Sequence, residues 1–407
     1  MTANFVPSGS IPKPLYWLSF GAFAIGTEGF MIAPLLSGIA SDLGVTIAAA
    51  GQLVTAFALA YALSSPVLAV VTGNVNRRRL LIACLAAFAA ANLVAVLSQG
   101  YWQLMGARLL LAFTAGLYVP SANAVATALV APTRRGTALS IVTGGTSLAI
   151  ALGVPLGAIV GHMSGWRTTF GAVAILASIA TLGLASGLPR GFGDDIAVAS
   201  LDARLAVARN PRVLLALLVT TLWATGAYTF YTYVGSYMAA AVGLDGAQLS
   251  VMLFAWGLSA ACGVFVGGRL TDKIGAARVI GPALVLLATA FVGLWLVARW
   301  ITPSAALVPV AALVVLWGMS AWSFFPAQQA RLIGIAGAPV APVALSLNAS
   351  FMFLGFSLGA MLGAVTLSRG TSADLGWVAA LCELAALLLS WAISLCPAPG
   401  PVNARVA

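Results

Sequence analysis

The sequence predicts an all-α integral membrane protein with twelve transmembrane helices in two bundles of six. Three observations lead to this fold class: the composition, twelve long apolar runs, and a single polar stretch near the middle of the chain. Of the 407 residues, 61% are hydrophobic and only 7% are charged, whereas an average soluble domain is about one-quarter charged. Too few charges remain to keep a soluble globule dispersed, so the outer surface is expected to lie in lipid.

Each apolar run is long enough to cross a bilayer, which takes roughly 20 residues because the hydrocarbon core is about 30 Å thick. Backbone groups find no partners in lipid, so the runs are predicted to be helices. The first run contains Glu28 and is too long for the apolar core of a signal peptide, so it is expected to be a membrane helix. The runs cover residues 15–40, 48–71, 80–97, 102–127, 137–160, 168–188, 213–241, 249–270, 278–298, 304–332, 340–366 and 373–395.

Polar residues concentrate in segment 189–212, which is expected to be a cytoplasmic linker between two six-helix bundles, residues 15–188 and 213–396. The tails 1–14 and 397–407 complete the predicted organisation. The charged residues of the linker include Asp194, Asp195, Asp202, Arg204 and Arg209.

The 19 basic residues predict which loops face the cytoplasm, because cytoplasmic loops carry the excess of Lys and Arg. Three of them, Arg167, Arg299 and Arg369, fall on one side, Arg108 lies within a predicted helix, and 15 fall on the other side. Both termini are therefore expected in the cytoplasm, and the short loops favour a bacterial inner membrane. The same signal explains the net charge of +10 better than nucleic acid or a polybasic lipid site does. The 15 residues are Lys13, Arg77, Arg78, Arg79, Arg134, Arg135, Arg190, Arg204, Arg209, Arg212, Arg269, Lys273, Arg278, Arg331 and Arg405.

The two halves of the chain resemble each other. The fifth predicted helix contains GVPLGAIVG from Gly153, and the eleventh contains GFSLGAMLG from Gly355. The shared pattern G-x-x-L-G-A-x-x-G falls at the same helix of each half. Many secondary transporters are built from duplicated halves, with the substrate site between them near the bilayer midplane.

Small residues recur every four positions along the fifth predicted helix and lie on one face. They allow another helix to approach closely, and Pro155 is expected to kink the helix because it removes an intrahelical hydrogen bond. Tight packing alone and a hinge or seal between the halves both remain open. The small residues are Gly145, Ala149, Gly153, Gly157 and Gly161.

The segment from Gly268 to Arg278 is predicted to be a tight cytoplasmic turn, because it contains Gly268 and Gly275. Asp272 can accept hydrogen bonds from neighbouring basic groups or from the first amides of the next helix. It could thus act as a charged latch between helices, or belong to an ordinary solvated loop.

These segments together resemble the major facilitator superfamily and its twelve-helix drug:proton antiporter branch. The pattern G-x-L-x-D-[RK]-x-G-x-x-R at 268–278 is the loop signature of that superfamily. Residues 26–32 (GTEGFMI), 50–55 (AGQLVT), 153–157 (GVPLG) and 165–167 (GWR), and Arg108 with Gly116, also match, so that the resemblance covers residues 15–395. It implies a proton-driven exporter.

Two shorter segments narrow the resemblance. Residues 322–329 (WSFFPAQQ) and 346–350 (SLNAS) are most similar to bacterial purine base and nucleoside efflux pumps, with arabinose-type and chloramphenicol exporters close by. The loop after the second helix departs from the family, because Ala69 and Gly73 stand where it has a glycine and an acid. Asp272 is therefore not expected to have a counterpart in the first half.

Glu28 and Arg108 lie inside predicted membrane helices, where an ionisable residue is costly and a functional candidate. Counting from Tyr16 places Glu28 about 18 Å above the cytoplasmic edge, and counting from Trp102 places Arg108 about 9 Å below the outer edge. The two depths agree within about one helical turn of a 30 Å core. These depths allow pairing, either direct or through water, but the adjacency of the two helices follows from the fold and not from counting.

Proton-coupled exchange is the mechanism that this pair predicts. A carboxylate in a poorly solvated cavity gains proton affinity, so protonated and ionised Glu28 would favour different conformations while Arg108 tunes the balance. The alternative is a static ion pair that fixes the first and fourth helices. Glu383 lies in the twelfth helix, which is usually peripheral in the family, and His162 is expected at the membrane interface; both are weaker proton-binding candidates.

Aromatic and amide side chains of later helices are candidates for the substrate cavity. The seventh helix is rich in aromatics, including Phe230, Tyr233 and Tyr237. Such faces with a few amides suit a flat, polar-edged ligand, although tyrosines also belt membrane interfaces. The candidates are Tyr228, Tyr231, Trp322, Gln328, Gln329 and Asn348.

The partners expected are a small-molecule substrate, protons and membrane lipid, with no metal or other cofactor. One histidine and four scattered cysteines, Cys84, Cys262, Cys382 and Cys396, show no metal-ligand spacing. A nucleotide-driven pump is excluded because no phosphate-binding loop is present. No catalytic constellation is visible, so a membrane enzyme is not expected. An importer or facilitator on the same fold, or a channel, remains an alternative, and a monomer is expected.

Overall fold

The computed structural model describes residues 11–189, 192, 206–207, 209–244, 246–337 and 340–395. Most of the two predicted tails and most of the predicted linker, including Asp194, Asp195, Asp202 and Arg204, lie outside the described residues, as does Cys396.

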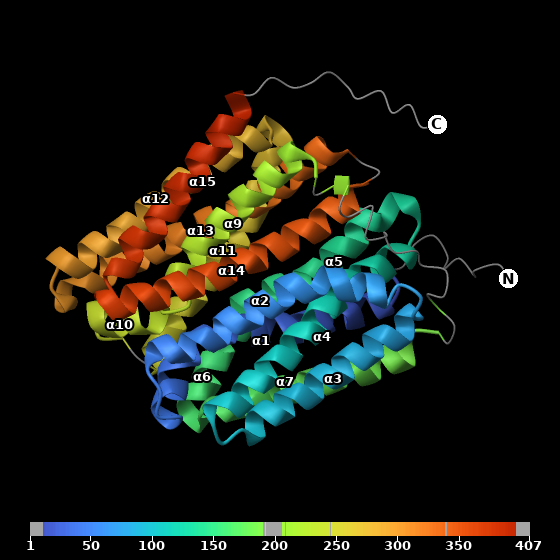
Figure 1. Ribbon diagram of the computed structural model, residues 1–407, viewed down its shortest axis with the longest axis horizontal. Helices are drawn as coiled ribbons and strands as arrows, with labels where there is room; N and C mark the ends of the chain where they lie inside the picture. The colour runs from blue at the N-terminus through green and yellow to red at the C-terminus, as the bar shows by residue number, and fades with distance from the viewer. Residues whose placement is uncertain are drawn as a thin grey trace.

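Six spans form the first part of the chain (Figure 1). A 3₁₀ turn at Pro132–Arg134 precedes the fifth span, which consists of two α-helices joined by a π-helical turn at Ala149–Gly153. The α-helices are α1 (Pro14–Asp42), α2 (Ile47–Val71), α3 (Arg77–Leu97), α4 (Tyr101–Ala128), α5 (Arg135–Leu148), α6 (Val154–Ser164) and α7 (Trp166–Gly187).

Six further spans form the rest. They comprise α9 (Pro211–Tyr231), with the short α10 (Val234–Val242) after it, α11 (Gly246–Ile274), α12 (Ala276–Trp300), α13 (Pro303–Ala336), α14 (Ala341–Arg369) and α15 (Asp374–Leu395). The structure therefore contains twelve helical spans long and apolar enough to cross a membrane within its described residues. The predicted fold class is confirmed, and each predicted run corresponds to one span.

The prediction of one continuous helix over residues 213–241 was wrong. Helix α9 ends at Tyr231, and a second helix, α10, begins at Val234. At the break, Tyr233 leaves helical geometry (φ −114°, ψ 22°), and its hydroxyl donates to the Ala360 carbonyl at 2.9 Å. A contact to α14, distant in sequence, thus accompanies the break.

The predicted face of small residues on the fifth span packs against α1. A Cβ at Gly145 would overlap the backbone carbonyl of Ser19, and one at Gly153 would overlap the Thr27 side chain. The two helices can approach this closely because neither position carries a side chain. Small residues are the usual means of close helix contact in membranes.

The same relation recurs in the last six spans. A Cβ at Gly359 of α14 would lie 2.9 Å from the Thr229 nitrogen of α9, and one at Gly355 would lie 2.6 Å from the Ala224 Cβ. In each half, the helix with the repeated glycine pattern therefore lies against the first helix of that half. The duplication read from sequence is thus matched in packing.

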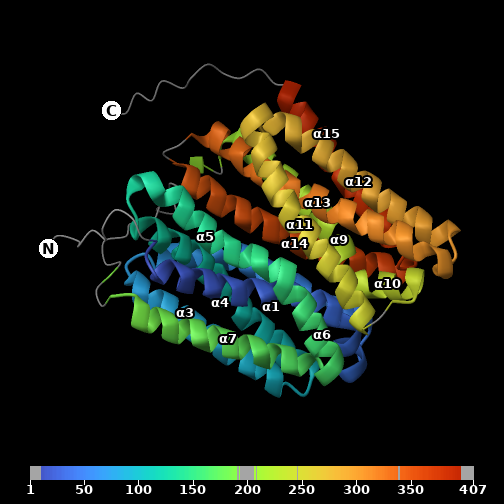
Figure 2. The same cartoon turned by 180° about the vertical axis from the view of Figure 1, so that it is seen from behind.

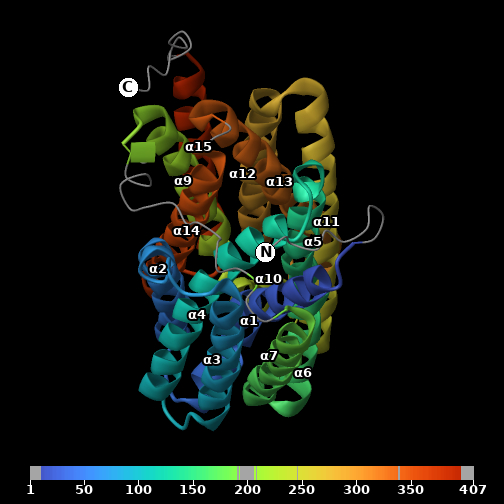
Figure 3. The ribbon, with the colours of Figure 1, turned by 90° about the vertical axis from the view of Figure 1, so that its right-hand side faces the viewer.

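The two halves form separate layers that meet along a common face. Figure 3 shows α12, α13 and α15 in the upper layer and α3, α4 and α7 in the lower layer. Between the layers, α2 packs on α14, and α11 packs on α6 and on the π-helical turn. A Cβ at Gly257 of α11 would lie 2.6 Å from the Ile150 carbonyl oxygen. In Figure 2, α5 and α11 diverge from this crossing toward the end where α5 begins and α11 ends.

Candidate functional site

Glu28 and Arg108 form a direct ion pair between α1 and α4. Both side chains are fully buried, and Arg108 Nη1 donates to Glu28 Oε1. The similar depths read from the sequence therefore correspond to real contact. Glu28 Oε2 and Arg108 Nη2 have no hydrogen-bond partner among the described residues, so the pair is joined through one oxygen and one nitrogen only.

The α2 helix supplies the remaining contacts of Arg108. The guanidinium carbon of Arg108 lies 4.1 Å from the centre of the Phe57 ring. Its Nε donates a long hydrogen bond of 3.4 Å to the Leu53 carbonyl. A cation over an aromatic face gains electrostatic stabilisation, about 2 kcal/mol when desolvated. Arg108 thus keeps favourable contacts that do not depend on Glu28.

A π-helical turn lies directly beside the acidic residue. The backbone N–H of Val154 donates to the carbonyl of Ala149, five residues earlier, and Gly153 in this turn packs against Thr27, the neighbour of Glu28. Pro155 was expected to kink this span, and the irregularity lies just before it, because proline has no N–H for the preceding turn. Single π turns occur often at functional sites.

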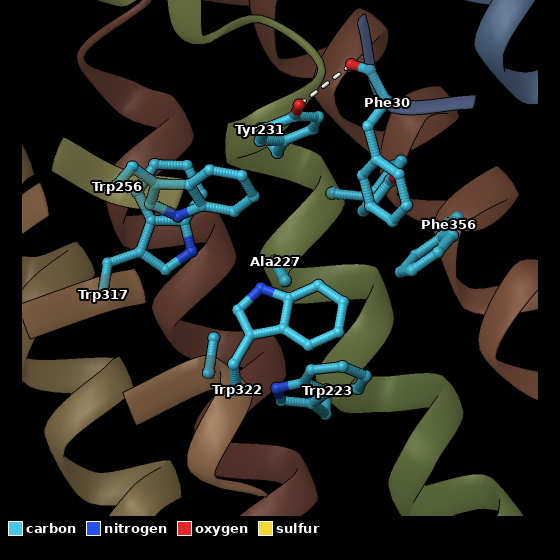
Figure 4. A pocket seen from close by; sticks show the side chains of 10 residues that line it. Phe30, Trp223, Ala227, Tyr231, Trp256, Trp317, Trp322 and Phe356 are labelled. Atoms are coloured by element: carbon cyan, nitrogen blue, oxygen red, sulfur yellow. Dashed lines mark hydrogen bonds between the residues drawn. The ribbon is translucent and has the colours of Figure 1, made fainter. Parts of the chain in front are cut away.

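A small aromatic pocket lies next to the ion pair, mostly within the last six spans. Its volume is about 20 Å³, and α1, α9, α11, α13 and α14 contribute its walls. In Figure 4, Trp256 and Trp317 lie on one side and Phe30 and Phe356 on the other. The lining residues are Phe30, Trp223, Ala227, Tyr228, Tyr231, Trp256, Trp317, Ala321, Trp322 and Phe356.

Ring contacts and one hydrogen bond hold the pocket walls in place. Tyr228 stacks on Phe356 with ring centres 3.6 Å apart, and the Tyr231 hydroxyl donates to the Phe30 carbonyl at 2.9 Å (Figure 4). The indole N–H groups of Trp223 and Trp256 have no acceptor among the described residues. The pocket therefore has flat apolar faces, and two side chains of its walls carry buried indole N–H groups without an acceptor.

The pocket and the ion pair belong to one site. Phe30 follows Glu28 by two residues on α1, and its ring contacts that of Tyr228 with the ring centres 6.2 Å apart. Phe57, which lies under Arg108, is also in ring contact with Phe353 of α14 at 6.4 Å. A change in charge at Glu28 or Arg108 would thus act, through these ring contacts, on the position of the side chains that line the pocket.

The structure separates the predicted substrate residues into two groups. Tyr228, Tyr231 and Trp322 line the pocket, whereas Gln328, Gln329 and Asn348 do not.

Two of those amides belong to a buried network with Thr220. The Thr220 hydroxyl donates to Asn348 Oδ1 at 2.7 Å, and Gln328 Nε2 donates to the Ala216 carbonyl at 2.5 Å and to Thr220 Oγ1 at 3.1 Å. Gln329 is half-buried.

Besides Ala227 and Ala321, five aromatic lining residues were missed by sequence reasoning: Phe30, Trp223, Trp256, Trp317 and Phe356. Their signal in the sequence was only that of bulky residues inside membrane helices. Conversely, two tyrosines of the aromatic seventh span have packing roles, because Tyr237 donates to the Leu294 carbonyl at 2.6 Å and Tyr233 to that of Ala360.

The loop motif of residues 268–278 lies at the junction between α11 and α12. Asp272 is in the last turn of α11, is exposed, and makes no hydrogen bond or ion pair with any residue that the structure describes. Gly275 joins α11 to α12 with φ +86°, a conformation that favours glycine. Gly268 lies within α11 and Arg278 within the first turn of α12, so the expected turn over 268–278 was wrong except at Gly275, and helix covers the rest of the segment.

The corresponding loop of the first half replaces the missing acid with backbone groups. Arg77 is buried, and its Nη2 donates to the Gly73 carbonyl at 2.7 Å. Arg78 donates to the carbonyls of Leu188 and Ala185 at 2.8 and 2.6 Å, which ties the loop to the end of α7.

Other ionisable or metal-binding side chains are dispersed. No group of three or more His, Cys, Asp or Glu side chains gathers within the described ranges. His162 is exposed at the end of α6, where its ring packs against Gly246 of α11. Asp42 pairs with Arg167, and Arg299 lies 3.5 Å from Asp374.

Twelve membrane spans in two repeated halves, with a buried charged pair beside a pocket at their contact, define the architecture of a secondary transporter. The chain belongs to the Major Facilitator Superfamily, whose family model matches residues 18–360. It is accordingly a membrane-embedded transporter of small molecules and not an enzyme.

Similar proteins come from several bacteria. The chain is 34% identical over 393 residues to a chloramphenicol resistance protein of Streptomyces lividans, covering 94% of this chain and 96% of that protein. It is 33% identical to the uncharacterized MFS-type transporter YbcL of Bacillus subtilis, with coverage of 92% and 94%. The inner membrane transport protein YdhP of Escherichia coli is 31% identical, with coverage of 88% and 90%. The predicted location, a multi-pass protein of the bacterial inner membrane, is confirmed.

Solved structures share the fold. A bacterial homologue of the human lysosomal transporter Spinster, in an inward-facing and occupied conformation, has a TM-score of 0.78 at 18% identity, covering 95% of this chain and 98% of the other. A mutant of the nucleoside transporter NupG has a TM-score of 0.72 at 14% identity, with coverage of 93% and 98%.

Proposed function

We propose that this protein exports small, flat organic molecules from the cytoplasm in exchange for protons, as a member of the drug:proton antiporter branch. One observation carries the proposal: a fully buried carboxylate, joined to one arginine by a single hydrogen bond, lies two residues from Phe30 in the wall of an aromatic pocket. The 34% identity to a chloramphenicol resistance protein supports an exported substrate of this kind.

Proton binding to Glu28 is the coupling step in this proposal. A protonated Glu28 no longer forms an ion pair, and Arg108 then keeps only the Phe57 ring and the Leu53 carbonyl. Because a single hydrogen bond joins the pair, its rupture requires little rearrangement. The α1 helix can then shift against the π-helical turn, where Gly153 meets Thr27.

Orientation gives this step its direction. With both termini in the cytoplasm, as the basic residues indicate, the contact of Gly257 with Ile150 lies at the level of the pocket, because Gly257 directly follows Trp256 of the pocket wall. The divergence of α5 and α11 (Figure 2) then faces the cytoplasm. Substrate would enter from the cytoplasm, and a proton bound from outside would accompany the return of the empty protein.

The pocket favours a ligand with an aromatic face and acceptor atoms at its edge. Flat rings can stack between the aromatic walls, and the free indole N–H groups of Trp223 and Trp256 can donate to a carbonyl, a nitro group or a ring nitrogen. Chloramphenicol and purine bases meet these requirements, whereas a sugar such as arabinose has no flat apolar face.

The pocket must enlarge before such a ligand can bind. Its present volume of about 20 Å³ holds one water molecule, whereas sites for drug-sized ligands measure about 300–1,000 Å³. Trp322 is half-buried at the wall, so its side chain can move with less loss of packing than the buried Trp223 or Trp317. We infer that Trp322 turns aside when substrate enters.

The same proposal assigns the remaining parts of the chain. Residues 15–188 and 213–396 would form the two bundles that move relative to each other, joined by the linker 189–212, with residues 1–14 and 397–407 as cytoplasmic tails. Asp272, together with Gly268, Gly275 and Arg278, would latch the cytoplasmic ends in the outward-facing state. The working unit would be a monomer without nucleic acid partners.

Flux in proteoliposomes tests this function. Wild-type protein, Glu28→Gln and the control Asp42→Asn would be compared under an imposed pH gradient with chloramphenicol, hypoxanthine, inosine and arabinose. Asp42 lies on the same helix but is exposed at its end, so its neutralisation should leave flux unchanged. Gradient-driven flux of an aromatic compound that Glu28→Gln abolishes supports the proposal. Equal flux in Glu28→Gln and wild type would reject Glu28 as the coupling group.

Flux in the opposite direction would instead identify an importer. The pH gradient is imposed in each of its two directions, and the side of the membrane on which the compound accumulates is compared with the direction in which protons move. An exporter concentrates the compound on the side from which protons leave, and an importer or symporter concentrates it on the side that protons enter.

A further inference from the structure

A second membrane carboxyl, Glu383 of α15, is buried without a counter-charge. Its side chain has no solvent exposure, and neither carboxyl oxygen makes a hydrogen bond of normal geometry within the described part of the chain. The backbone N–H of Ala227 lies close enough to act on it electrostatically. Glu28, by contrast, has Arg108 as a direct partner.

Glu383 packs directly on the wall of the aromatic pocket. A Cβ at Gly226 of α9 would lie 2.5 Å from Glu383 Oε1 and 2.8 Å from the Ala379 carbonyl oxygen, so the absence of a side chain at Gly226 makes room for the carboxyl. The next residue, Ala227, lines the pocket, as do Tyr228 and Phe356, whose rings stack on each other. Residues 226–228 of α9 thus lie between Glu383 and the pocket.

None of the described basic residues forms an ion pair with Glu383. The ion pairs between described residues do not include it, since Arg299 contacts Asp374, and Arg331 donates instead to Ser390 Oγ at 2.8 Å, about 10 Å further along α15. The titratable or charged groups of α15 and of the helices around it are Asp374 and Cys382 on α15, Arg212, Tyr228 and Tyr231 on α9, Arg278 and Arg299 on α12, Arg331 on α13, and Arg369 on α14.

The burial decides the charge of this carboxyl. An isolated ionised carboxylate in an apolar site is so costly that the group takes up a proton instead. The close contact with Gly226 is therefore compatible with the neutral acid and not with the ionised form. Release of the proton would require a conformation in which the α9–α15 contact is hydrated.

We propose that Glu383 is a second proton-binding site, which releases its proton when α9 moves away from α15 during transport. The proposal rests on the proposed function, because it presumes a proton-driven cycle. The transporter would then carry two protons per cycle, one at Glu28 and one at Glu383. The two sites lie on opposite sides of the Gly226–Tyr228 turn, so that movement of this turn links them to the same pocket.

Infrared difference spectroscopy on purified, reconstituted protein tests the charge state without any substrate. A protonated carboxyl has a carbonyl-stretch band that an ionised carboxylate lacks. Wild type, Glu383→Gln and Glu28→Gln would be compared across pH. We expect one band component that disappears in Glu383→Gln and remains in Glu28→Gln. Identical spectra of wild type and Glu383→Gln in this region would overturn the proposal.

Transport stoichiometry tests the coupling role. The limiting ratio is the ratio of the substrate concentrations on the two sides of the membrane once net transport stops. At a pH gradient of one unit and zero membrane potential, each coupled proton multiplies this ratio about tenfold. Glu383→Gln is neutral and nearly isosteric, so it should fold and still respond to the gradient, with a limiting ratio about tenfold lower than that of wild type. An unchanged ratio would reduce Glu383 to a packing residue.

The two proposals fail in different ways. If wild-type protein shows no gradient-driven transport, the proton-driven function itself is rejected, together with any coupling role of Glu383. If wild type is coupled and only the ratio in Glu383→Gln is unchanged, the function stands and the second proton site is rejected.

Discussion

Replacing Arg108 with methionine tests how much the buried ion pair contributes to stability. The substitution keeps an unbranched side chain of similar length but leaves Glu28 buried without a counter-charge. Removal of one partner of a buried pair costs about 3–5 kcal/mol, whereas replacement of both partners by neutral groups is often neutral. We therefore expect Arg108→Met to lower the free energy of unfolding by about 3–5 kcal/mol and Glu28→Gln with Arg108→Met to restore most of it.

The matched control is the ion pair at the end of α1. Arg167 and Asp42 are likewise joined through one nitrogen and one oxygen, but their side chains are 34% and 45% exposed. Exposed pairs contribute about 0–1 kcal/mol, so Asp42→Asn, which leaves the hydrogen bonds of Arg167 to the Ser98 carbonyl in place, should change stability little. Denaturant unfolding in mixed micelles at alkaline pH, where proton uptake by Glu28 is least favourable, measures both. Equal losses in Arg108→Met and Asp42→Asn, or a double variant as unstable as Arg108→Met, would refute the reasoning.

Three further predictions address packing and the pocket. Gly153→Val should cost about 1–3 kcal/mol of stability and slow transport, because its side chain would overlap α1, whereas Gly144→Val, where space is open, should do neither; thermal unfolding and flux measure both. Trp223→Phe should weaken binding of an acceptor-bearing substrate by about 0.5–1.5 kcal/mol, roughly two- to tenfold, while Trp295→Phe, outside the pocket, should leave the dissociation constant unchanged. Tyr231→Phe removes a hydrogen bond to the backbone of α1, so it should cost about 0.5–1.5 kcal/mol; unchanged unfolding would show that this bond does not stabilise the contact between the halves.

The twelve spans could be predicted from sequence because lipid imposes a minimum length and excludes charge along each of them. The similar depth of Glu28 and Arg108 could be anticipated for a related reason, since depth follows from counting residues along a helix, whereas the contact between their helices had to come from the structure. The glycine face of the fifth span likewise predicted a close helix contact, and only the identity of the partner helix, α1, had to come from the structure.

The break after Tyr231 and the composition of the pocket could not be predicted in this way. The break depends on the Tyr233 hydroxyl reaching Ala360, a residue of another helix. Gln328 was expected at the substrate cavity, but it donates instead to Thr220 and Ala216 on a neighbouring helix. Such choices of partner are set by the way in which the helices pack, and the sequence of one helix does not contain that information.

The measurement that tests the central claim most directly is exchange of radiolabelled substrate at equal pH on both sides, set beside uptake driven by a pH gradient, for wild type and Glu28→Gln. A permanently neutral residue at position 28 cannot gain or lose a proton, but it leaves the pocket intact. Our account predicts that Glu28→Gln keeps exchange at equal pH and loses the response to the gradient. A Glu28→Gln variant that still concentrates substrate under the gradient as well as wild type would contradict it.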